Sequence, residues 1–268
     1  MTQKQLTEKA RQIRLDAVKM IGRAGSGHPG GALSAADMLV ALYYSKMKLY
    51  EDPADERRDR FVLSKGHSNP ALYAILADKG YVPAEEKLWL RRLHHPFQGH
   101  PESSKCPGID CSTGSLGQGV SVAVGMALGF KLKGLPNQVY AMTGDGELDE
   151  GICWEAFMSA AHYKLDNLTV LVDKNGLQID GSTDQVMSQG DLKAKFEAFG
   201  FATDVIDGHD MGQILKALDK KTEGKPHCII ANTIKGKGVS FMENQVGWHG
   251  KAPNAEQLAV AVADLGGK

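Results

Sequence analysis

Two apolar stretches, each followed at once by a short polar turn, constrain this chain most strongly. Residues 139–143 run directly into Gly144-Asp145-Gly146, and residues 168–173 run into a turn that holds Asn175, thirty positions after Asp145. The segment between them is typical of a helix, so the order is strand, turn, helix, strand. In an open parallel sheet, ligands bind at the carboxyl ends of the strands. Asp145 and Asn175 are therefore expected at a ligand-binding edge.

The chemistry of these two side chains suits a metal ion that carries a diphosphate. One carboxylate and one amide oxygen, held on rigid strand ends, are ligands that Mg²⁺ and Ca²⁺ accept. The flanking glycines allow the backbone to approach phosphate groups closely. An alternative stays open at this point, in which Asp145 caps the helix that begins near Gly151 and Asn175 merely occupies a turn.

The rest of the chain continues the alternation of strands and helices. Strands are expected at 61–64, 139–143, 168–173, 201–205 and 227–233. Helices are expected from the N-terminus to Gly22 and at 34–46, 69–79, 83–92, 119–133, 191–199, 212–221 and 254–265. This order predicts an α/β fold, doubly wound, with a mostly parallel sheet and helices on both faces. No repeat or linker is visible, so residues 1–268 are expected to form a single domain.

Composition excludes several classes of protein. The chain has 268 residues, 42% of them hydrophobic, and a formal net charge of −1, so it carries no basic excess for nucleic acid or a membrane surface. No apolar run is long enough to span a bilayer, which favours the cytoplasm. The four cysteines are expected to be reduced thiols, because their spacing matches no zinc site; they are Cys106, Cys111, Cys153 and Cys228.

Histidine and glycine recur in five further motifs. In chain order these are Ser26-Gly27-His28-Pro29-Gly30, Ser64-Lys65-Gly66-His67, Gly99-His100-Pro101-Glu102, Gly114-Ser115-Leu116-Gly117-Gln118-Gly119 and Trp248-His249-Gly250. Together with the Gly-Asp-Gly and its distant Asn, they make the chain resemble the transketolase family over essentially its whole length. Transketolases move a two-carbon ketol unit between sugars with thiamine diphosphate and a divalent metal. The resemblance implies the diphosphate-binding fold of thiamine enzymes, with Mg²⁺ or else Ca²⁺ or Mn²⁺.

The resemblance also implies roles for the histidines. His28 and His249 would contact the carbonyl and hydroxyls of the donor sugar as proton-transfer groups, which imidazoles can do near neutral pH. His67 would lie beside the diphosphate, with His249 nearby. His100 would hold the terminal hydroxyl of the donor. The other five histidines match no motif and are expected to have no role in the site; they are His94, His95, His162, His209 and His227.

Cofactor and metal contacts follow from the same resemblance. The metal would be bound by Asp145, Asn175 and the backbone carbonyl of Leu177. The cofactor itself would be contacted by His67, His249, Gly114, Ser115, Leu116, Gly144 and Gly146, the last donating its amide to the diphosphate. Lys235 would face the entrance or the diphosphate, although Lys237 could take its place.

One acidic residue carries a catalytic expectation. Glu150 matches the family glutamate that reaches across the subunit interface towards the carboxylate that activates the cofactor. Glu147 and Asp149 are interpreted as ordinary acidic residues before a helix, where the helix dipole favours negative charge.

The family resemblance stops short of a complete enzyme. In the family, the activating carboxylate, the pyrimidine pocket and most sugar-phosphate arginines lie in further domains. We therefore expect the amino-terminal subunit of a split transketolase, an α2β2 heterotetramer. A second chain would bring the pyrimidine-binding and C-terminal domains, and this chain alone would be inactive on sugar phosphates. An excised fragment of a longer protein is the alternative.

Other functions remain open. A related thiamine enzyme, such as deoxyxylulose phosphate synthase or an oxo-acid dehydrogenase component, shares the Gly-Asp-Gly and Asn pattern but generally lacks the full histidine set. A transketolase-like enzyme for an unusual sugar is also compatible. From another class, the chain could be a non-catalytic module that binds thiamine diphosphate. A nicotinamide-binding domain is disfavoured, because no Gly-x-Gly-x-x-Gly follows the first strand.

Overall fold

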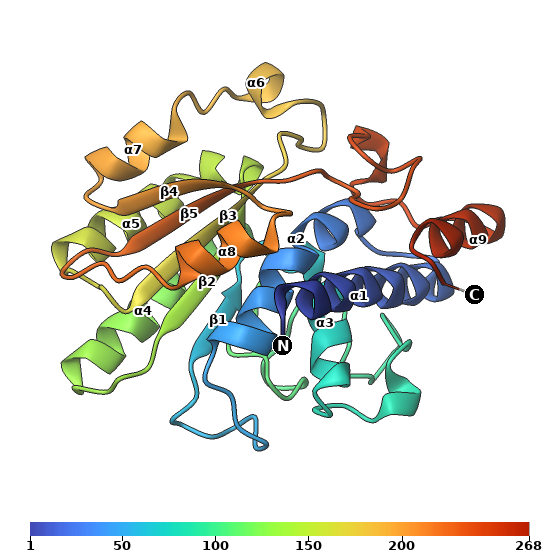
Figure 1. Cartoon of the computed structure of the whole chain (residues 1–268), viewed down its shortest axis with the longest axis horizontal. Coiled ribbons are helices and arrows are strands. Elements are labelled where there is room, and N and C mark those ends of the chain that lie inside the picture. The colour runs from blue at the N-terminus through green and yellow to red at the C-terminus, as the bar shows by residue number, and fades with distance from the viewer. Residues whose placement is uncertain (268) are drawn as a thin grey trace.

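The structure is a computed structural model that describes residues 1–267 (Figure 1). Its centre is a parallel sheet with the strand order β1-β2-β3-β5-β4. The strands are β1 (Arg60–Leu63), β2 (Val139–Gly144), β3 (Leu168–Lys174), β4 (Ala202–Asp207) and β5 (His227–Asn232). The predicted fold class is confirmed.

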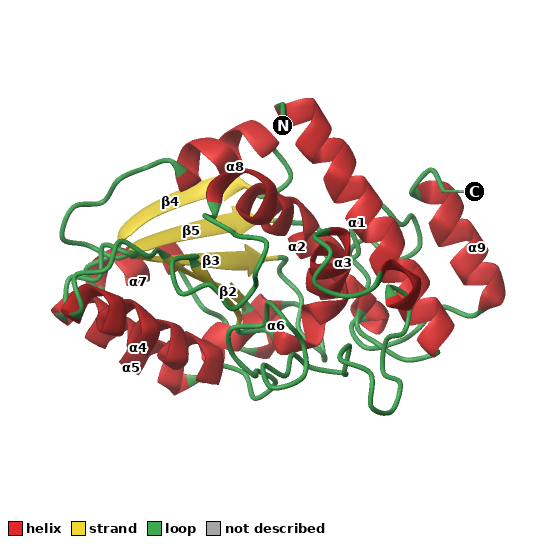
Figure 2. Ribbon diagram, turned by 90° about the horizontal axis from the view of Figure 1, so that it is seen from below, coloured by secondary structure: helices red, strands yellow, loops and turns green. Residues whose placement is uncertain are grey.

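Side chains alternate between two cores on the two faces of this sheet. Along β2, Tyr140 and Met142 join one core, whereas Val139 and Ala141 join the other. The first core is completed by α1 (Gln3–Ala24), α2 (Pro29–Ala41), α3 (Asn69–Asp78) and α8 (Met211–Leu218). The second is completed by α4 (Gln118–Leu132), α5 (Gly151–His162) and α7 (Leu192–Ala198). Figure 2 shows the sheet between α8 on one side and α4 and α5 on the other. Burial on both faces explains why the strands read as continuous apolar runs.

The first two helices differ from their expected bounds for local reasons. α1 continues past Gly22 to Ala24 and ends at Gly25, whose φ of 63° is the left-handed conformation that glycine adopts at helix ends. α2 begins at Pro29 rather than at Ser34, because proline suits the first helical turn. Ser34 is consequently a buried mid-helix residue, and its hydroxyl hydrogen-bonds Asp173 at 2.5 Å.

The expected helix over 83–92 is wrong. Only a short 3₁₀ turn, Ala84–Glu86, forms there, and the chain then closes a loop in which the Arg91 amide donates to the Phe97 carbonyl at 2.7 Å. Arg91 and His94 adopt φ values of 57° and 63°, which an α-helix does not allow. The ring centroids of His95 and Phe97 are 5.2 Å apart, so aromatic packing stabilises this loop in place of a helix.

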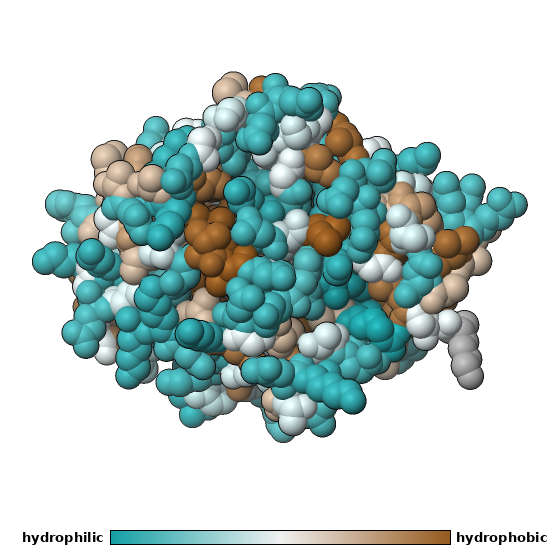
Figure 3. Space-filling model, turned by 45° about the horizontal axis from the view of Figure 1, so that its top comes forward, coloured by the Kyte–Doolittle hydropathy of each residue, from teal (hydrophilic) through white to brown (hydrophobic). Residues whose placement is uncertain are grey.

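The C-terminal segment adds a smaller, third apolar cluster. α9 (Ala255–Asp264) packs beside α1, and Trp248 and Leu265 lie in the cluster between them. A further helix, α6 (Thr183–Val186), lies over the carboxyl side of the sheet (Figure 1). Within residues 1–267, no helix combines the length and the apolar character that crossing a membrane requires. Figure 3 shows a mostly hydrophilic face with separate hydrophobic patches.

Candidate active site

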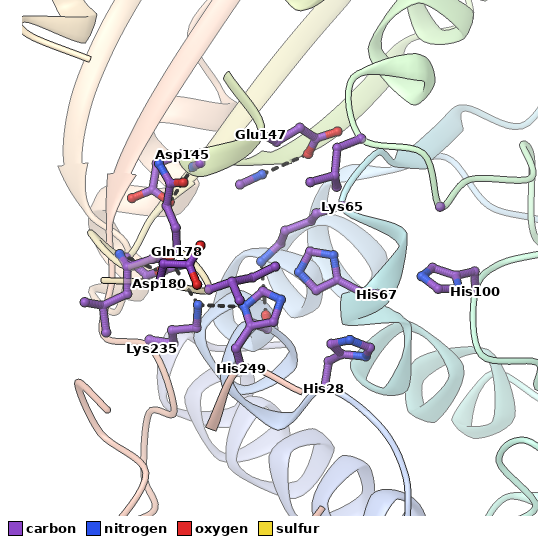
Figure 4. Close-up of a pocket in the computed structure, with 18 residues that line it drawn as sticks. His28, Lys65, His67, His100, Asp145, Glu147, Gln178, Asp180, Lys235 and His249 are labelled. Atoms are coloured by element: carbon purple, nitrogen blue, oxygen red, sulfur yellow. Dashed lines mark hydrogen bonds between the residues drawn. The ribbon is translucent and has the colours of Figure 1, made fainter. Parts of the chain in front are cut away.

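The site lies where four strands end. β1 leads to Lys65 and His67, β2 to Asp145, β3 to Asn175, and β5 to Lys235. Their side chains surround a pocket of about 330 Å³ (Figure 4). The expected site residues that line it are His28, His67, His100, Gly114, Leu116, Gly144, Asp145, Gly146, Asn175, Leu177, Lys235 and His249. The pocket therefore forms at the carboxyl edge of the parallel sheet, where the sequence places it.

Four histidines from distant segments converge on this pocket. The ring centroids of His67 and His249 are 5.0 Å apart, and those of His28 and His67 are 5.3 Å apart. His28 lies 5.5 Å from His249 and 6.4 Å from His100. Figure 4 shows the four rings along one wall, facing the Asp145 side across the pocket. Such a cluster can donate and accept hydrogen bonds to several hydroxyl and carbonyl oxygens of one ligand.

The histidines are held in their neutral form. Burial lowers the pKa of His28 to about 4, with further lowering by the charge of Arg91. Burial and the Lys235 ammonium lower the pKa of His249 to about 4 as well. Burial, and then Lys65, hold the pKa of His67 well below its usual value. At neutral pH each ring therefore carries one N–H donor and one nitrogen acceptor.

Asp145 is a carboxylate buried beneath the pocket and held by backbone donors. It is 1% exposed, and its two oxygens accept hydrogen bonds from the amides of Gly146 at 2.9 Å and Gly176 at 2.6 Å. Burial raises its pKa to about 6, and the nearby Asp173 carboxylate adds to that rise. Asp145 does not cap α5, because it accepts no hydrogen bond from the amides of that helix, but it caps the short 3₁₀ helix Gly146–Asp149 through the Gly146 amide.

Asn175 and Leu177 line the same pocket as Asp145 and bring two further kinds of oxygen atom to it. The side-chain oxygen of Asn175 accepts a hydrogen bond from the Leu177 amide at 3.2 Å. The Leu177 carbonyl oxygen accepts one from the Lys235 ammonium at 3.0 Å. A carboxylate, an amide oxygen and a carbonyl oxygen are the donor set of a hard divalent cation. In the described part of the chain no three His, Cys, Asp or Glu side chains are grouped to hold a metal, so diphosphate oxygens would have to complete the coordination.

Lys235 lies deeper in the site than expected. It is 2% exposed, and its ammonium also donates to Nδ1 of His249 at 3.0 Å. Burial, followed by repulsion from Lys65, lowers its pKa to about 8. Lys237, the alternative, instead forms a surface ion pair with Glu243 at 3.6 Å. The glycine-rich loop thus sends only one of its two lysines into the pocket.

A buried polar network supports the floor of the pocket. The Lys65 ammonium donates to the Gly31 carbonyl at 3.0 Å and pairs with the Asp173 carboxylate, which is fully buried. Ser34 and Thr233 also donate to Asp173. Because every oxygen of Asp173 has a donor, the network fixes the ends of β1, β3 and β5 relative to each other.

Glu147, interpreted from sequence as an ordinary acidic residue, is a structural member of the site. It is 2% exposed and accepts hydrogen bonds from the Ser64 hydroxyl and from the amides of Gly117 at 2.8 Å and Gly144 at 3.1 Å. Burial raises its pKa, while these hydrogen bonds oppose the rise. It therefore ties together three of the glycine motifs. Its place directly after Gly-Asp-Gly is the signal in the sequence that could have found it.

His209, which matches no motif, supports the site from behind. Its Nδ1 lies 2.8 Å from Asp37, and its Nε2 accepts a hydrogen bond from the Ile234 amide at 2.8 Å. Since Ile234 precedes Lys235, this contact holds the backbone that carries the pocket lysine. No sequence pattern links His209 to that loop.

Two expected site residues lie outside the pocket. Ser115 is exposed next to Leu116, which does line it. Glu150 is exposed directly before α5, and its side chain has no hydrogen bond or ion pair with the residues described.

Comparisons with known proteins agree with this geometry. The family described as "Transketolase, thiamine diphosphate binding domain" matches residues 3–268. The chain is 45% identical over 263 residues to the 6-deoxy-6-sulfo-D-fructose transketolase subunit SqwG of Clostridium sp. (strain MSTE9), covering 97% of this chain and 96% of that subunit. It is 39% identical to a subunit of the apulose-4-phosphate transketolase of Actinobacillus succinogenes, with the same coverage of 97% and 96%.

A solved structure shows how the chain relates to longer transketolases. The transketolase of Campylobacter jejuni superposes with a TM-score of 0.92 at 35% identity, covering 100% of this chain but 44% of its own. The chain thus spans less than half of that protein, whereas it spans nearly all of the two subunits. The family match, the identity to the subunits and the superposition agree. This chain belongs to the transketolase family and corresponds to its thiamine diphosphate-binding domain.

Proposed function

We propose that this chain is the thiamine diphosphate-binding subunit of a split transketolase, which transfers a two-carbon ketol unit from a ketose phosphate to an aldose phosphate. The observation that carries the proposal is the convergence of four neutral histidines opposite Asp145 and Asn175 in one pocket. Relatives named as transketolase subunits, similar over nearly their whole length, support it. On this proposal, residues 1–268 are a single domain.

The cofactor would lie with its diphosphate at the strand ends. Gly144 has open space where a side chain would project, with only Lys65 within 4 Å, so a phosphate can approach its backbone. His67 would donate to the diphosphate, and so would the Gly146 amide, which donates to Asp145 in this structure. Gly114 and Leu116, which line the pocket, and the exposed Ser115 between them would contact the cofactor beside the diphosphate. Bound thiamine diphosphate would supply the carbon centre that accepts the two-carbon unit.

The metal would be Mg²⁺, or Ca²⁺ or Mn²⁺ in its place. Asp145, Asn175 and the Leu177 carbonyl would hold it, since all three residues line the same pocket and bring oxygen ligands. The Lys235 ammonium, 3.0 Å from the Leu177 carbonyl, would add positive charge next to the diphosphate.

The histidines would handle the sugar. His28 and His249 would hydrogen-bond the donor carbonyl and hydroxyls and move protons between them, because a neutral imidazole can both give and take a proton. His100, at the outer end of the row of rings, would hold the terminal hydroxyl of the donor. All of these steps use neutral rings, consistent with the lowered pKa values of His28 and His249.

A second chain would complete the site in an α2β2 heterotetramer. It would carry the pyrimidine-binding and C-terminal domains and the carboxylate that activates the cofactor. Glu150, exposed and without a partner in residues 1–267, would reach that carboxylate across the interface. The subunit names of the relatives support such a partner. A cytoplasmic location stays a prediction.

The test is a donor comparison with the reconstituted pair, in which the purified chain and its partner are combined with thiamine diphosphate and Mg²⁺. We expect transfer from a ketose phosphate to an aldose phosphate, and none from pyruvate. Release of carbon dioxide from pyruvate with condensation onto an aldehyde would instead favour the deoxyxylulose phosphate synthase alternative. Cofactor binding without turnover on either donor would favour the non-catalytic module.

A further inference from the structure

Arg91, which no motif singles out, touches the histidine cluster from outside the pocket. One of its terminal guanidinium nitrogens donates to the Ser26 hydroxyl at 2.9 Å, and the other lies 3.4 Å from Nδ1 of His28. A guanidinium has only donors. Nδ1 of His28 must therefore be the acceptor in this contact, which requires that the nitrogen carry no proton.

The loop that carries Arg91 has an unusual backbone conformation. Arg91 has a φ of 57°, a left-handed conformation that strains the backbone of a residue other than glycine. The Phe97 carbonyl stabilises this conformation by accepting a hydrogen bond from the Arg91 amide at 2.7 Å. The Phe97 ring stacks on the Tyr73 ring, with 4.4 Å between the ring centroids. Strain of this kind persists only where surrounding structure enforces it, and here it aims the guanidinium at His28.

Nothing else in the described residues accounts for the direction of this side chain. Arg91 forms no ion pair with any carboxylate in residues 1–267, and the polar partners of its side chain are the hydroxyl of Ser26 and the ring of His28. Room for the guanidinium comes from Gly99, where an added Cβ would lie 3.2 Å from the Arg91 Cζ. The neighbouring Arg92 is exposed and lies over the Trp89 ring at 5.6 Å.

The same arrangement occurs a second time in the cluster. Lys235 donates to Nδ1 of His249 at 3.0 Å, and an ammonium, like a guanidinium, can only donate. Two of the four pocket histidines therefore have a cationic donor at Nδ1. In both, Nε2 is left as the nitrogen that carries the proton and is available to a ligand.

We propose that Arg91 is a positioning residue that holds His28 as the neutral tautomer with its proton on Nε2. His28 then presents an N–H donor to a substrate oxygen before any ligand binds, and the ring is not free to flip. This inference rests on the proposed role of His28 at the sugar, but the tautomer itself can be measured without turnover.

The charged groups that act on His28, Arg91 and Lys235, favour the neutral ring. Arg91 faces its Nδ1 edge, and His67, His249 and His100 lie on the pocket side at 5.3, 5.5 and 6.4 Å between ring centroids. The charge of Lys235 also lowers the pKa of His28, by less than the charge of Arg91 does. No carboxylate is among the groups that shift its pKa. Among these groups, Arg91 is the one that also determines which nitrogen is protonated.

The test is imidazole nitrogen–proton NMR of the isotope-labelled full chain, with the His28 signals assigned from a His28→Gln variant. In the wild type we expect the Nε2-protonated tautomer at pH 7. In Arg91→Met we expect a mixture of tautomers and a pKa of His28 higher by about one pH unit, since a positive charge next to the ring has been removed. Arg91→Lys should largely restore both, and Arg92→Met, which removes the neighbouring arginine, should change neither.

A wild-type His28 with its proton on Nδ1 would overturn the proposal, and so would an Arg91→Met spectrum identical to the wild type. If Arg91→Met does not fold, the wild-type tautomer and the Arg91→Lys variant decide the question. In the reconstituted pair, Arg91→Met should also move the acidic limb of the kcat/KM profile to higher pH. A correct tautomer in a chain that supports no ketol transfer would count against the proposed function and not against the role of Arg91.

Discussion

Asp145 is the residue on which the metal assignment depends. In Asp145→Ala the pocket loses its buried carboxylate, and a buried charged interaction contributes about 3 kcal/mol, so metal-dependent affinity for thiamine diphosphate should fall by about 100-fold. Calorimetric titration of the reconstituted pair with the cofactor and Mg²⁺ measures it. Asp184→Ala removes an exposed carboxylate from the start of α6 and serves as the control. Equal affinities in the two variants would refute the metal site.

The lowered pKa values of two pocket histidines also predict how the free energy of unfolding depends on pH. The pKa values of His28 and His249 are about 4 in the folded chain against 6.5 ordinarily. Between those values the unfolded chain binds protons that the folded chain does not, so both residues make the free energy of unfolding decrease as pH falls from 6.5 to 4. Asp145, with its raised pKa of about 6, acts in the opposite direction over part of this range. Comparing the wild type with a variant that lacks the two histidines therefore separates their effect from that of Asp145.

Replacing both rings isolates their effect. The ligand-free double variant His28→Gln, His249→Gln should lose less stability than the wild type between about pH 6.5 and pH 4.5, measured by urea unfolding. His162→Gln, at the exposed end of α5, should behave like the wild type. A double variant with the same pH slope as the wild type would show that the two rings are not held neutral.

At the residue scale, the site residues that stand in motifs can be predicted from the sequence. Those whose contacts form only when a loop folds cannot. His28, His67, His100 and His249 can be chosen because each stands beside glycine or proline in an ordered motif. Glu147 resembles a solvated acid, since nothing in the sequence shows that its side chain turns back onto the amide before α4 and the amide at the end of β2. Arg91 is equally hidden, because its contact with His28 depends on a loop where the apolar spacing predicts a helix.

At the element scale, the glycines of α4 have different roles along one helix. A Cβ at Gly119 would lie 2.8 Å from the Ser64 Cα, whereas nothing lies within 4 Å of a Cβ at Gly125. Glycine is a poor helix former, so its recurrence in a helix indicates close packing. Within the described residues, only the end of α4 near the pocket packs in this way, which leaves the Gly125 face open to another subunit.

These two glycines provide a matched pair of variants. Gly119→Ala should lower the free energy of unfolding by about 1–3 kcal/mol, because the backbone of Ser64 must move. Gly125→Ala should raise it in the isolated chain by about 0.5–1 kcal/mol, because alanine favours a helix. Urea unfolding measures both. Equal effects would contradict the packing of α4 against the end of β1.

Strands are easier to predict than helices in this chain. All five expected strands form within two residues of their predicted ends, since burial on both faces requires continuous apolar runs. The apolar spacing of segment 83–92 fits a helix that does not form. Tertiary contacts of His95 and Phe97, which lie beyond the segment, stabilise a turn there instead.

At the scale of the whole molecule, the pocket is open on one side. His100 is exposed although it lines the pocket, and Glu150 has no partner among the groups that the structure describes. The sequence indicates this incompleteness through the family resemblance alone. The carboxyl edge of the sheet brings the histidines, Asp145 and Lys235 to this pocket.

The most direct test of the account is the initial rate of ketol transfer with the purified chain, its purified partner and their mixture, each saturated with thiamine diphosphate and Mg²⁺. We expect no turnover by either chain alone, and activity in the mixture that saturates when the two chains are present in equal amounts. Robust ketol transfer by this chain without a partner would contradict it.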